Sequence, residues 1–266
     1  MNAPTRIALT RAVPPSIGRC ELTHLARSPI DVELAARQHA AYENALRAAG
    51  CDVRRIPPEP DLPDSVFVED TAVVLDEVAV VTRPGAPSRR PETASTAAAL
   101  RAHRPLAFIE EPGTLDGGDV LVAGKTVFAG VGTRSNEEGL RQLSSHLAPF
   151  GYDVRGVVVH SCLHLKSAAT LVSASSVLVN PALVDPRAFA PLEPVAVAPE
   201  EPSAANALLV GGVVVYSLAY PRTLGVLERR GARVILVDLG ELAKAEGALT
   251  CCSLVFDGQT GSGLKA

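Results

Sequence analysis

The stretch that decides the fold reads Asp119-Val120-Leu121-Val122-Ala123-Gly124-Lys125-Thr126-Val127-Phe128-Ala129-Gly130. A polar residue opens an apolar strand, Gly124-Lys125 provides a tight turn, and a second apolar strand follows. A capped helix and a further strand come next in the chain. This unit therefore predicts two paired strands, a helix and a third strand.

The same pattern recurs along the chain, with strands that open near Asp70, Ala169 and Asn206 and a half-copy that opens at Cys252. From Asp70 through Asp119, Ala169 and Asn206 to Cys252, successive openers are 49, 50, 37 and 46 residues apart, a period typical of propellers and arrays. Hairpins of similar length also recur by chance in α/β proteins. The agreement in spacing and in opener polarity favours a true repeat.

Local signals complete the units. The first expected helix has Ser28 as its N-cap and Pro29 as its first residue, and it ends before Gly50 as the C′ residue. The other expected elements are a helix opened by the capping box Ser135-Asn136-Glu137-Glu138, a helix over Pro221–Arg230, a strand over Arg233–Val237 and a terminal strand over Thr5–Thr10. The terminal strand can pair with Cys252–Phe256. We expect an α/β propeller of five ββαβ units closed by its two terminal strands, forming one domain over residues 1–266 with a flexible tail at 257–266.

Composition limits the function. The 266 residues are 47% hydrophobic and 20% charged, as in folded globular proteins, and the net charge of −4 disfavours nucleic acid as a partner. Five cysteines without a framework spacing favour a reducing, cytoplasmic location, and no signal peptide is expected. The longest apolar run, Ala207–Tyr220, is short for a membrane span and is broken by Gly211-Gly212.

Three segments carry reactive side chains, namely Ser65-Val66-Phe67-Val68-Glu69-Asp70, Leu163-His164-Leu165-Lys166-Ser167 and Thr250-Cys251-Cys252-Ser253. They supply a thiol, an imidazole and paired carboxylates, which suit nucleophilic attack on a cationic carbon. In a ring of five units the openers would meet at one end of the channel. The openers and their sequence neighbours include Glu69, Asp70, Asp116, Asp119, His164 and Cys251. Together they predict a narrow acidic site for a planar cation.

These segments, together with Thr82–Arg90 and Thr114-Leu115-Asp116-Gly117-Gly118-Asp119-Val120, resemble the dimethylarginine dimethylaminohydrolase family of the guanidine-modifying (pentein) superfamily. The resemblance runs from Arg6 to Phe256 and implies the five-bladed α/β propeller of that superfamily. It also implies hydrolysis of Nω-methylated L-arginine to L-citrulline and methylamine or dimethylamine, through a covalent thiouronium on cysteine.

The resemblance implies three catalytic residues. Cys251 is the nucleophile, because the family places it directly after a Leu-Thr lead-in, and strand alternation would turn Cys252 to the other face. His164 is the general acid and base, with His160 as its nearest competitor. Asp116 orients the imidazole, although on local chemistry alone it reads equally well as a turn residue before Gly117-Gly118.

The resemblance also implies the substrate contacts. Asp70, helped by Glu69, binds the guanidinium. Arg89 and Arg134 bind the α-carboxylate, and Arg90 competes with Arg89 for that part. Leu22, Asp64 and Ala245 line the amino-acid end of the substrate, largely through backbone groups, and Leu22 lies in a segment suited to act as a lid.

We expect no metal or organic cofactor, a small-molecule substrate, no nucleic-acid or membrane partner, and a monomer or homodimer. A soft metal ion bound adventitiously by Cys251 and His164 would inhibit. Within the superfamily, arginine deiminase or another guanidine hydrolase is the alternative. A non-catalytic binding protein of the same fold is a remote one, since such a protein would lack the cysteine, histidine and paired acids together.

Overall fold

The computed structural model describes residues 5–258. Its strands are β1 (Arg6–Thr10), β2 (Cys51–Arg55), β3 (Ala72–Val74), β4 (Ala79–Val81), β5 (Leu106–Phe108), β6 (Val120–Ala123), β7 (Thr126–Val131), β8 (Asp153–Val158), β9 (Ala169–Leu171), β10 (Ser176–Val179), β11 (Glu193–Ala196), β12 (Leu208–Val210), β13 (Val213–Ser217), β14 (Arg233–Val237) and β15 (Leu254–Asp257). The α-helices are α1 (Val32–Ala48), α2 (Thr93–Leu100), α3 (Glu137–Leu147), α4 (Leu165–Ala168), α5 (Pro221–Arg229) and α6 (Gly240–Ala243).

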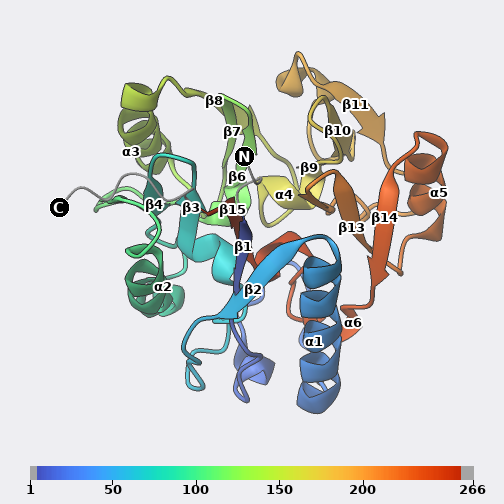
Figure 1. Ribbon diagram of the computed structural model, residues 1–266, viewed down its shortest axis with the longest axis horizontal. Helices are drawn as coiled ribbons and strands as arrows, with labels where there is room; N and C mark the ends of the chain where they lie inside the picture. The colour runs from blue at the N-terminus through green and yellow to red at the C-terminus, as the bar shows by residue number, and fades with distance from the viewer. Residues whose placement is uncertain (1–4, 259–266) are drawn as a thin grey trace.

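These strands form five three-stranded sheets, in the orders β15-β1-β2, β3-β4-β5, β6-β7-β8, β9-β10-β11 and β12-β13-β14. In each sheet the first strand pairs antiparallel with the middle strand, and the third pairs parallel with it. The first strands, β3, β6, β9, β12 and β15, all line one central cavity of about 550 Å³. The sheets are thus the blades of a five-bladed α/β propeller, as predicted, with α1, α2, α3 and α5 on its outside (Figure 1).

The ring closes through the two ends of the chain. β1 pairs antiparallel with β15, from Arg6 opposite Asp257 to Leu9 opposite Leu254, and Arg6 Nε donates to Asp257 Oδ1 at 2.9 Å. This confirms the predicted closure and places Asp257 in a strand. The Gly258 N–H likewise donates to Thr5 O at 2.7 Å, so the predicted flexibility is wrong for Asp257 and Gly258. Residues 259–266 of the predicted tail lie outside the described residues.

Two helix starts differ from the predictions. Asp31, not Ser28, caps α1, because its carboxylate accepts the Leu34 N–H at 2.9 Å. Asn136, not Ser135, caps α3 by accepting the Gly139 N–H at 2.8 Å. In both cases the capping oxygen belongs to the residue that can reach the third N–H of the helix. Gly50, with φ of 97°, follows α1 as predicted.

The β9-β10-β11 blade lacks the predicted α-helix. A 3₁₀ turn over Pro186–Phe189 connects its second and third strands, and Phe189 packs on Phe128 of the neighbouring blade with ring centroids 5.2 Å apart. This short connection explains why the spacing from the third opener to the fourth is the smallest of the series.

The reactive segments precede the inner strands as short helical turns. They include the 3₁₀ turns Val68–Thr71 before β3, Gly117–Asp119 before β6 and Thr250–Cys252 before β15, with α4 before β9. Cys251 and Cys252 were predicted on a strand, so the alternation argument is wrong. Successive side chains of a 3₁₀ turn rotate by about 120°, and here Cys252 is fully buried while Cys251 is partly exposed.

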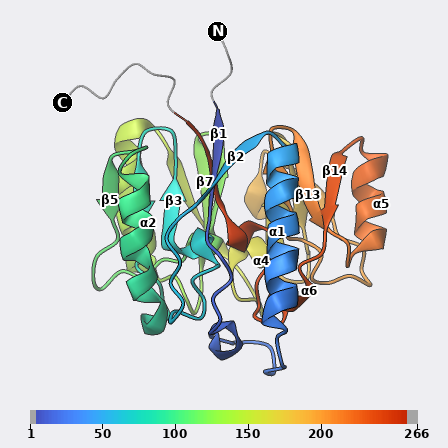
Figure 2. The ribbon, with the colours of Figure 1, turned by 60° about the horizontal axis from the view of Figure 1, so that its bottom comes forward.

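The two ends of the channel differ. The turns of several hairpins and the paired ends of β1 and β15 lie at one end, whereas the segment between β1 and α1 lies at the other (Figure 2). The central cavity lies on the hairpin side, with Glu69, Gly117, Lys166 and Thr250 among its lining residues. None of the helices within residues 5–258 has the length and hydropathy needed to traverse a lipid bilayer.

Candidate active site

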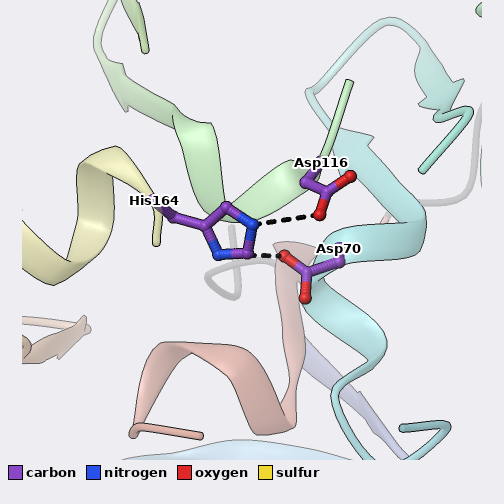
Figure 3. Close-up of side chains that lie close together, drawn as sticks. All are labelled: Asp70, Asp116 and His164. Atoms are coloured by element: carbon purple, nitrogen blue, oxygen red, sulfur yellow. Dashed lines mark hydrogen bonds and ion pairs between the residues drawn. The ribbon is translucent and has the colours of Figure 1, made fainter. Parts of the chain in front are cut away.

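A buried histidine lies between two buried carboxylates (Figure 3). His164 Nε2 is 3.0 Å from Asp116 Oδ2, and His164 Nδ1 is 3.8 Å from Asp70 Oδ1. The three residues come from three blades, each in the turn just before an inner strand. The ring of blades thus brings together side chains that are 46 or more positions apart in the sequence.

Gly118 permits this close approach. A Cβ atom at position 118 would lie 2.6 Å from His164 Nδ1 and 2.8 Å from Asp70 Oδ1. The Gly118 N–H also donates to Asp70 Oδ1 at 3.0 Å. The sequence predicts Gly117-Gly118 only as a turn, and nothing in it indicates that residue 118 must lack a Cβ atom.

The electrostatics favour a charged imidazole. Burial alone would lower the pKa of His164, but Asp70, followed by the hydrogen bond to Asp116, raises it to about 9. Burial alone would raise the pKa of Asp70, but His164 and Arg89 together lower it to about 2. An imidazolium and an ionised Asp70 are therefore the forms present near neutral pH.

We expect the Asp70→Asn variant to lower the pKa of His164 toward or below its usual value, because the negative charge that raises this pKa most is removed. NMR titration of the imidazole in the two proteins checks this. The parent imidazolium should contribute stability fully below about pH 6.5 and lose it as the pH rises through about 9. Identical His164 titrations in parent and variant would contradict the assigned cause.

The Cys251 thiol lies in an acidic environment. Burial raises the pKa of Cys251, and the Glu69 and Asp70 carboxylates raise it further, with Arg89 opposing them. In the substrate-free protein the thiol is therefore protonated near neutral pH. A cation brought against Glu69 and Asp70 would offset their charge and favour the thiolate.

Glu69 and Asp70 turn to different partners. Glu69 accepts hydrogen bonds from Lys166 Nζ at 2.6 Å and from Thr250 Oγ1 at 2.7 Å. Asp70 instead faces His164 and forms an ion pair of 2.5 Å with Arg89. Burial raises the pKa of Glu69 despite Lys166. Asp70 is thus the carboxylate beside His164. Glu69 instead contacts the 3₁₀ turn Thr250–Cys252, which we call the cysteine turn.

The two predicted carboxylate-binding arginines differ in their surroundings. Arg89 is buried and donates from all three nitrogens, to Asp70, to Glu92 and to backbone carbonyls that include Phe67 O. Arg134 Nη2 donates to Thr23 Oγ1 at 3.0 Å, so it lies under the segment between β1 and α1. Arg90 is bound elsewhere, by donating from Nε to Pro84 O.

The segment around Leu22 is held over this end of the propeller by acids. The Asp64 carboxylate accepts the Glu21 N–H at 3.1 Å. Glu246 accepts the N–H groups of Thr23, His24 and Leu25 at 2.5–3.0 Å. Ala245, just before it, is buried in the same apolar cluster against which Leu22 packs. Glu246 was missed, because nothing in its local sequence distinguishes it from an exposed surface glutamate.

Asp119 does not lie in the site with the other predicted acids. Its carboxylate accepts the Leu165 N–H at 2.9 Å and the Ser135 hydroxyl at 2.6 Å, and Ser135 Oγ in turn accepts the Asp116 N–H at 3.1 Å. Asp119 and Ser135 thus support the backbone on either side of the His164–Asp116 contact. Ser135 was missed, since its sequence context indicates only a helix cap.

Oxygen and nitrogen atoms of Asp70, Asp116 and His164 lie within 4.8 Å of one another, a spacing that would suit a metal ion. Arg89 and Gly118 already donate to Asp70, and Gly85 donates to Asp116 at 2.8 Å. The cation between the two carboxylates is the His164 imidazolium, whose pKa, against the effect of burial, is raised by Asp70 and by the hydrogen bond to Asp116 to about 9. His160, the competitor of His164, is exposed on the segment that follows β8.

Comparison with known proteins identifies similar chains. The family model described as Arginine deiminase matches residues 59–207. The N(G),N(G)-dimethylarginine dimethylaminohydrolase of Streptomyces coelicolor is 42% identical over 253 residues, covering 94% of this chain and 97% of the relative. The protein of the same name from Pseudomonas aeruginosa is 36% identical over 228 residues, covering 85% and 90%.

Solved structures agree with the sequence comparisons. A cysteine-to-serine mutant of the Pseudomonas aeruginosa enzyme, complexed with citrulline, superposes with a TM-score of 0.88 at 34% identity, covering 96% of this chain and 100% of that one. A histidine-to-glycine mutant of a dimethylarginine dimethylaminohydrolase, in an adduct with S-methyl-L-thiocitrulline, gives 0.88 at 33% identity, covering 94% and 98%. The N-terminal domain of a cyanobacterial arginine dihydrolase shares the fold, with a TM-score of 0.82 at 19% identity.

Proposed function

Because this chain belongs to the dimethylarginine dimethylaminohydrolase family, we propose that it hydrolyses Nω-methylated L-arginine to L-citrulline and methylamine or dimethylamine. The observation that carries the proposal is the buried His164 held between Asp116 and Asp70. It provides a proton carrier beside a carboxylate that can hold a guanidinium. The named relatives and their complexes with citrulline and a thiocitrulline support the same chemistry.

Binding prepares the nucleophile. The substrate guanidinium is a planar cation, and Asp70, with Glu69 nearby, supplies the carboxylate that hydrogen-bonds it. Its positive charge offsets the two carboxylates that raise the pKa of Cys251. The Cys251 thiol then loses its proton to solvent more readily, since the His164 imidazolium is already protonated, and the thiolate forms where the electrophilic carbon is bound.

In the first half-reaction the Cys251 sulfur forms a bond to the guanidinium carbon and gives a tetrahedral adduct. The adduct collapses by breaking the bond from that carbon to the alkylated nitrogen. The His164 imidazolium gives its proton to the departing amine, which leaves a cationic thiouronium on Cys251. Asp116 holds the imidazole orientation through both charge states.

In the second half-reaction the neutral His164 takes a proton from water as the water oxygen bonds to the thiouronium carbon. The new tetrahedral adduct breaks its carbon–sulfur bond and gives up its hydroxyl proton to solvent, which releases citrulline and restores the Cys251 thiolate. The same imidazole therefore serves as acid in one step and as base in the next. His164 is therefore an imidazolium again at the end of the cycle.

The direct test is citrulline release, measured in parallel on monomethylarginine, asymmetric dimethylarginine, arginine and agmatine. We expect the methylated arginines to give the highest kcat/KM. Higher kcat/KM on arginine would assign the arginine deiminase activity instead. That second candidate is favoured by the family model, whose description is arginine deiminase.

The amino-acid end of the substrate is proposed to meet Arg134 through its α-carboxylate, with Leu22, Asp64 and Ala245 lining that end. Arg89, predicted for the same contact, has all three nitrogens committed within the protein. We propose that Arg89 chiefly keeps Asp70 ionised. A contact between Arg89 and the substrate carboxylate would require Arg89 to give up one of these hydrogen bonds.

Replacing Arg134 with glutamine should raise KM for methylarginine strongly, with a smaller effect on kcat, since the carboxylate is remote from the reacting carbon. Agmatine lacks that carboxylate, so it should be a poor substrate of the parent and should lose much less from the same replacement. Steady-state kinetics on both compounds gives the comparison, with Arg90→Gln as the matched control. Equal turnover of agmatine and methylarginine by the parent would remove the carboxylate contact from the proposal.

All five cysteines are free, which supports a reducing compartment such as the cytoplasm. We propose a monomer or homodimer acting on a small molecule.

A further inference from the structure

The turns before the inner strands are joined by a continuous set of hydrogen bonds across the channel. Lys166 Nζ donates to Glu69 Oε1 at 2.6 Å and to Gly117 O at 3.2 Å. Glu69 Oε2 accepts from Thr250 Oγ1 at 2.7 Å. Together with Asn206 these residues, one from each blade, form what we call the inner ring: Glu69, Gly117, Lys166, Asn206 and Thr250.

Asn206 closes this ring through both ends of its amide. Its Nδ2 donates to Thr250 Oγ1 and to Lys166 O, each at 3.0 Å. Its Oδ1 accepts the Thr250 N–H at 3.2 Å. The side chain is only 6% exposed, and a buried amide of this kind is favourable only when its polar atoms are paired.

The two segments that Asn206 joins are those that carry the reactive groups. Thr250 immediately precedes Cys251, and Lys166 lies two residues after His164. Asn206 itself belongs to the β12-β13-β14 blade, which contributes none of the predicted catalytic or substrate-binding side chains from its strands. Its amide therefore links the cysteine turn to the histidine turn from a third blade.

We propose that Asn206 is a positioning residue, which fixes the turn that carries Cys251 relative to the turn that carries His164. This inference rests on the proposed function for its kinetic consequence. The side-chain hydrogen bonds of Asn206 go to Thr250 and Lys166, so Asn206 acts through these two residues rather than on the reacting atoms. The Thr250 hydroxyl also donates to Glu69, so a shift of Thr250 would move its contact with Glu69 as well.

Asn206→Ala should lower kcat by roughly 10- to 100-fold with little change in KM, as for a reacting group displaced by about 1 Å. The matched control is Asn180→Ala. Asn180 is equally buried, at 5%, and its amide is also paired, with Pro202 O and the Ala182 N–H. Parent-like kcat in Asn206→Ala, or a loss no larger than that of Asn180→Ala, would overturn the proposal.

A second pair of variants keeps the test informative if Asn206→Ala does not fold. Thr250→Val removes the hydroxyl while keeping the side-chain shape, and should also lower kcat. Thr250→Ser retains the hydroxyl and should restore most of the parent kcat. Equal activity of the two Thr250 variants would contradict a role for the hydroxyl in the ring.

Backbone hydrogen–deuterium exchange separates this inference from the proposed function, because it needs no substrate. Asn206→Ala should accelerate exchange in peptides that contain Thr250 and in peptides that contain Leu165–Ser167, whereas Asn180→Ala should accelerate neither. Joint loss of protection supports the positioning link even if the parent hydrolyses no methylarginine. Unchanged protection in both segments would overturn the link, whatever the substrate.

Discussion

The Cys251→Ser variant is expected to lose turnover of methylarginine by on the order of 10⁴-fold or more, as when the nucleophile of a covalent enzyme is removed. Serine retains the size of the side chain, but its hydroxyl is far less acidic and less nucleophilic than a thiol. The variant should still bind substrate, because Asp70, Glu69 and Arg134 are untouched. Citrulline formation and a binding assay on the same protein measure the two effects.

Cys252→Ser is the matched control, since it makes the same chemical change one residue away. Cys252 is buried, and its sulfur lies 3.5 Å from Ala248 O, a contact that a serine hydroxyl can also make. We expect most of the activity to remain. Mass spectrometry of parent protein quenched during turnover should find the covalent intermediate on Cys251. A dead Cys252 variant beside an active Cys251 variant would reverse the assignment.

The second large effect is expected for His164→Gly. Loss of the imidazole should slow both half-reactions, each by the roughly 10²- to 10⁴-fold that general acid–base catalysis contributes. Attack by Cys251 can still occur, but the amine would depart without a proton from His164. Hydrolysis of the thiouronium would then proceed without a general base. Rapid-quench measurement of amine and citrulline resolves the two steps.

His160→Gly is the control for this variant, because His160 is exposed and its backbone N–H, which donates to Leu183 O at 2.9 Å, is retained by glycine. It should retain parent-like kinetics. An active His164→Gly protein together with an inactive His160→Gly protein would transfer the acid–base role. The folding of His164→Gly should be checked at low pH, where the parent imidazolium contributes most to stability.

The repeated pattern of opener, strand, turn and strand was sufficient to predict the architecture. The turn at Gly124-Lys125, the closure of β1 on β15 and the parallel strand β14 follow from local apolar runs and turn residues. These signals are short-range and agree with one another from blade to blade. Closure follows from the half-copy at the C-terminus, which lacks a partner until the first strand supplies it.

Details at the ends of elements were less predictable. Asp31 and Asn136 replace the predicted caps, because capping depends on which oxygen reaches a helix N–H rather than on residue type alone. The placement of Cys251 on a 3₁₀ turn likewise depends on tertiary contacts, among them the Asn206–Thr250 pair. No pattern within a single segment records such a contact.

The acids show the same limit. Asp70 and Asp119 are both strand openers, yet Asp70 contacts His164 while Asp119 supports the backbone of Leu165 from behind. Sequence adjacency to an inner strand brings a side chain to the right end of the channel. It does not decide which way the side chain turns, because that choice depends on partners from other blades, such as Ser135 and Arg89.

The pairing of β1 with β15 also has a consequence for biosynthesis. A ribosome releases the chain from its N-terminus, so β1 and β2 emerge early, but the first blade cannot be completed until residues 254–257 have been made. The cysteine turn belongs to that same last segment. The other four sheets, from β3 to β14, lie wholly between residues 72 and 237 and precede this segment in the chain, whereas ring closure and the turn that carries Cys251 depend on residues made later. A nascent chain that stalls before residue 251 therefore carries four of the five sheets but neither Cys251 nor the strand that closes the ring.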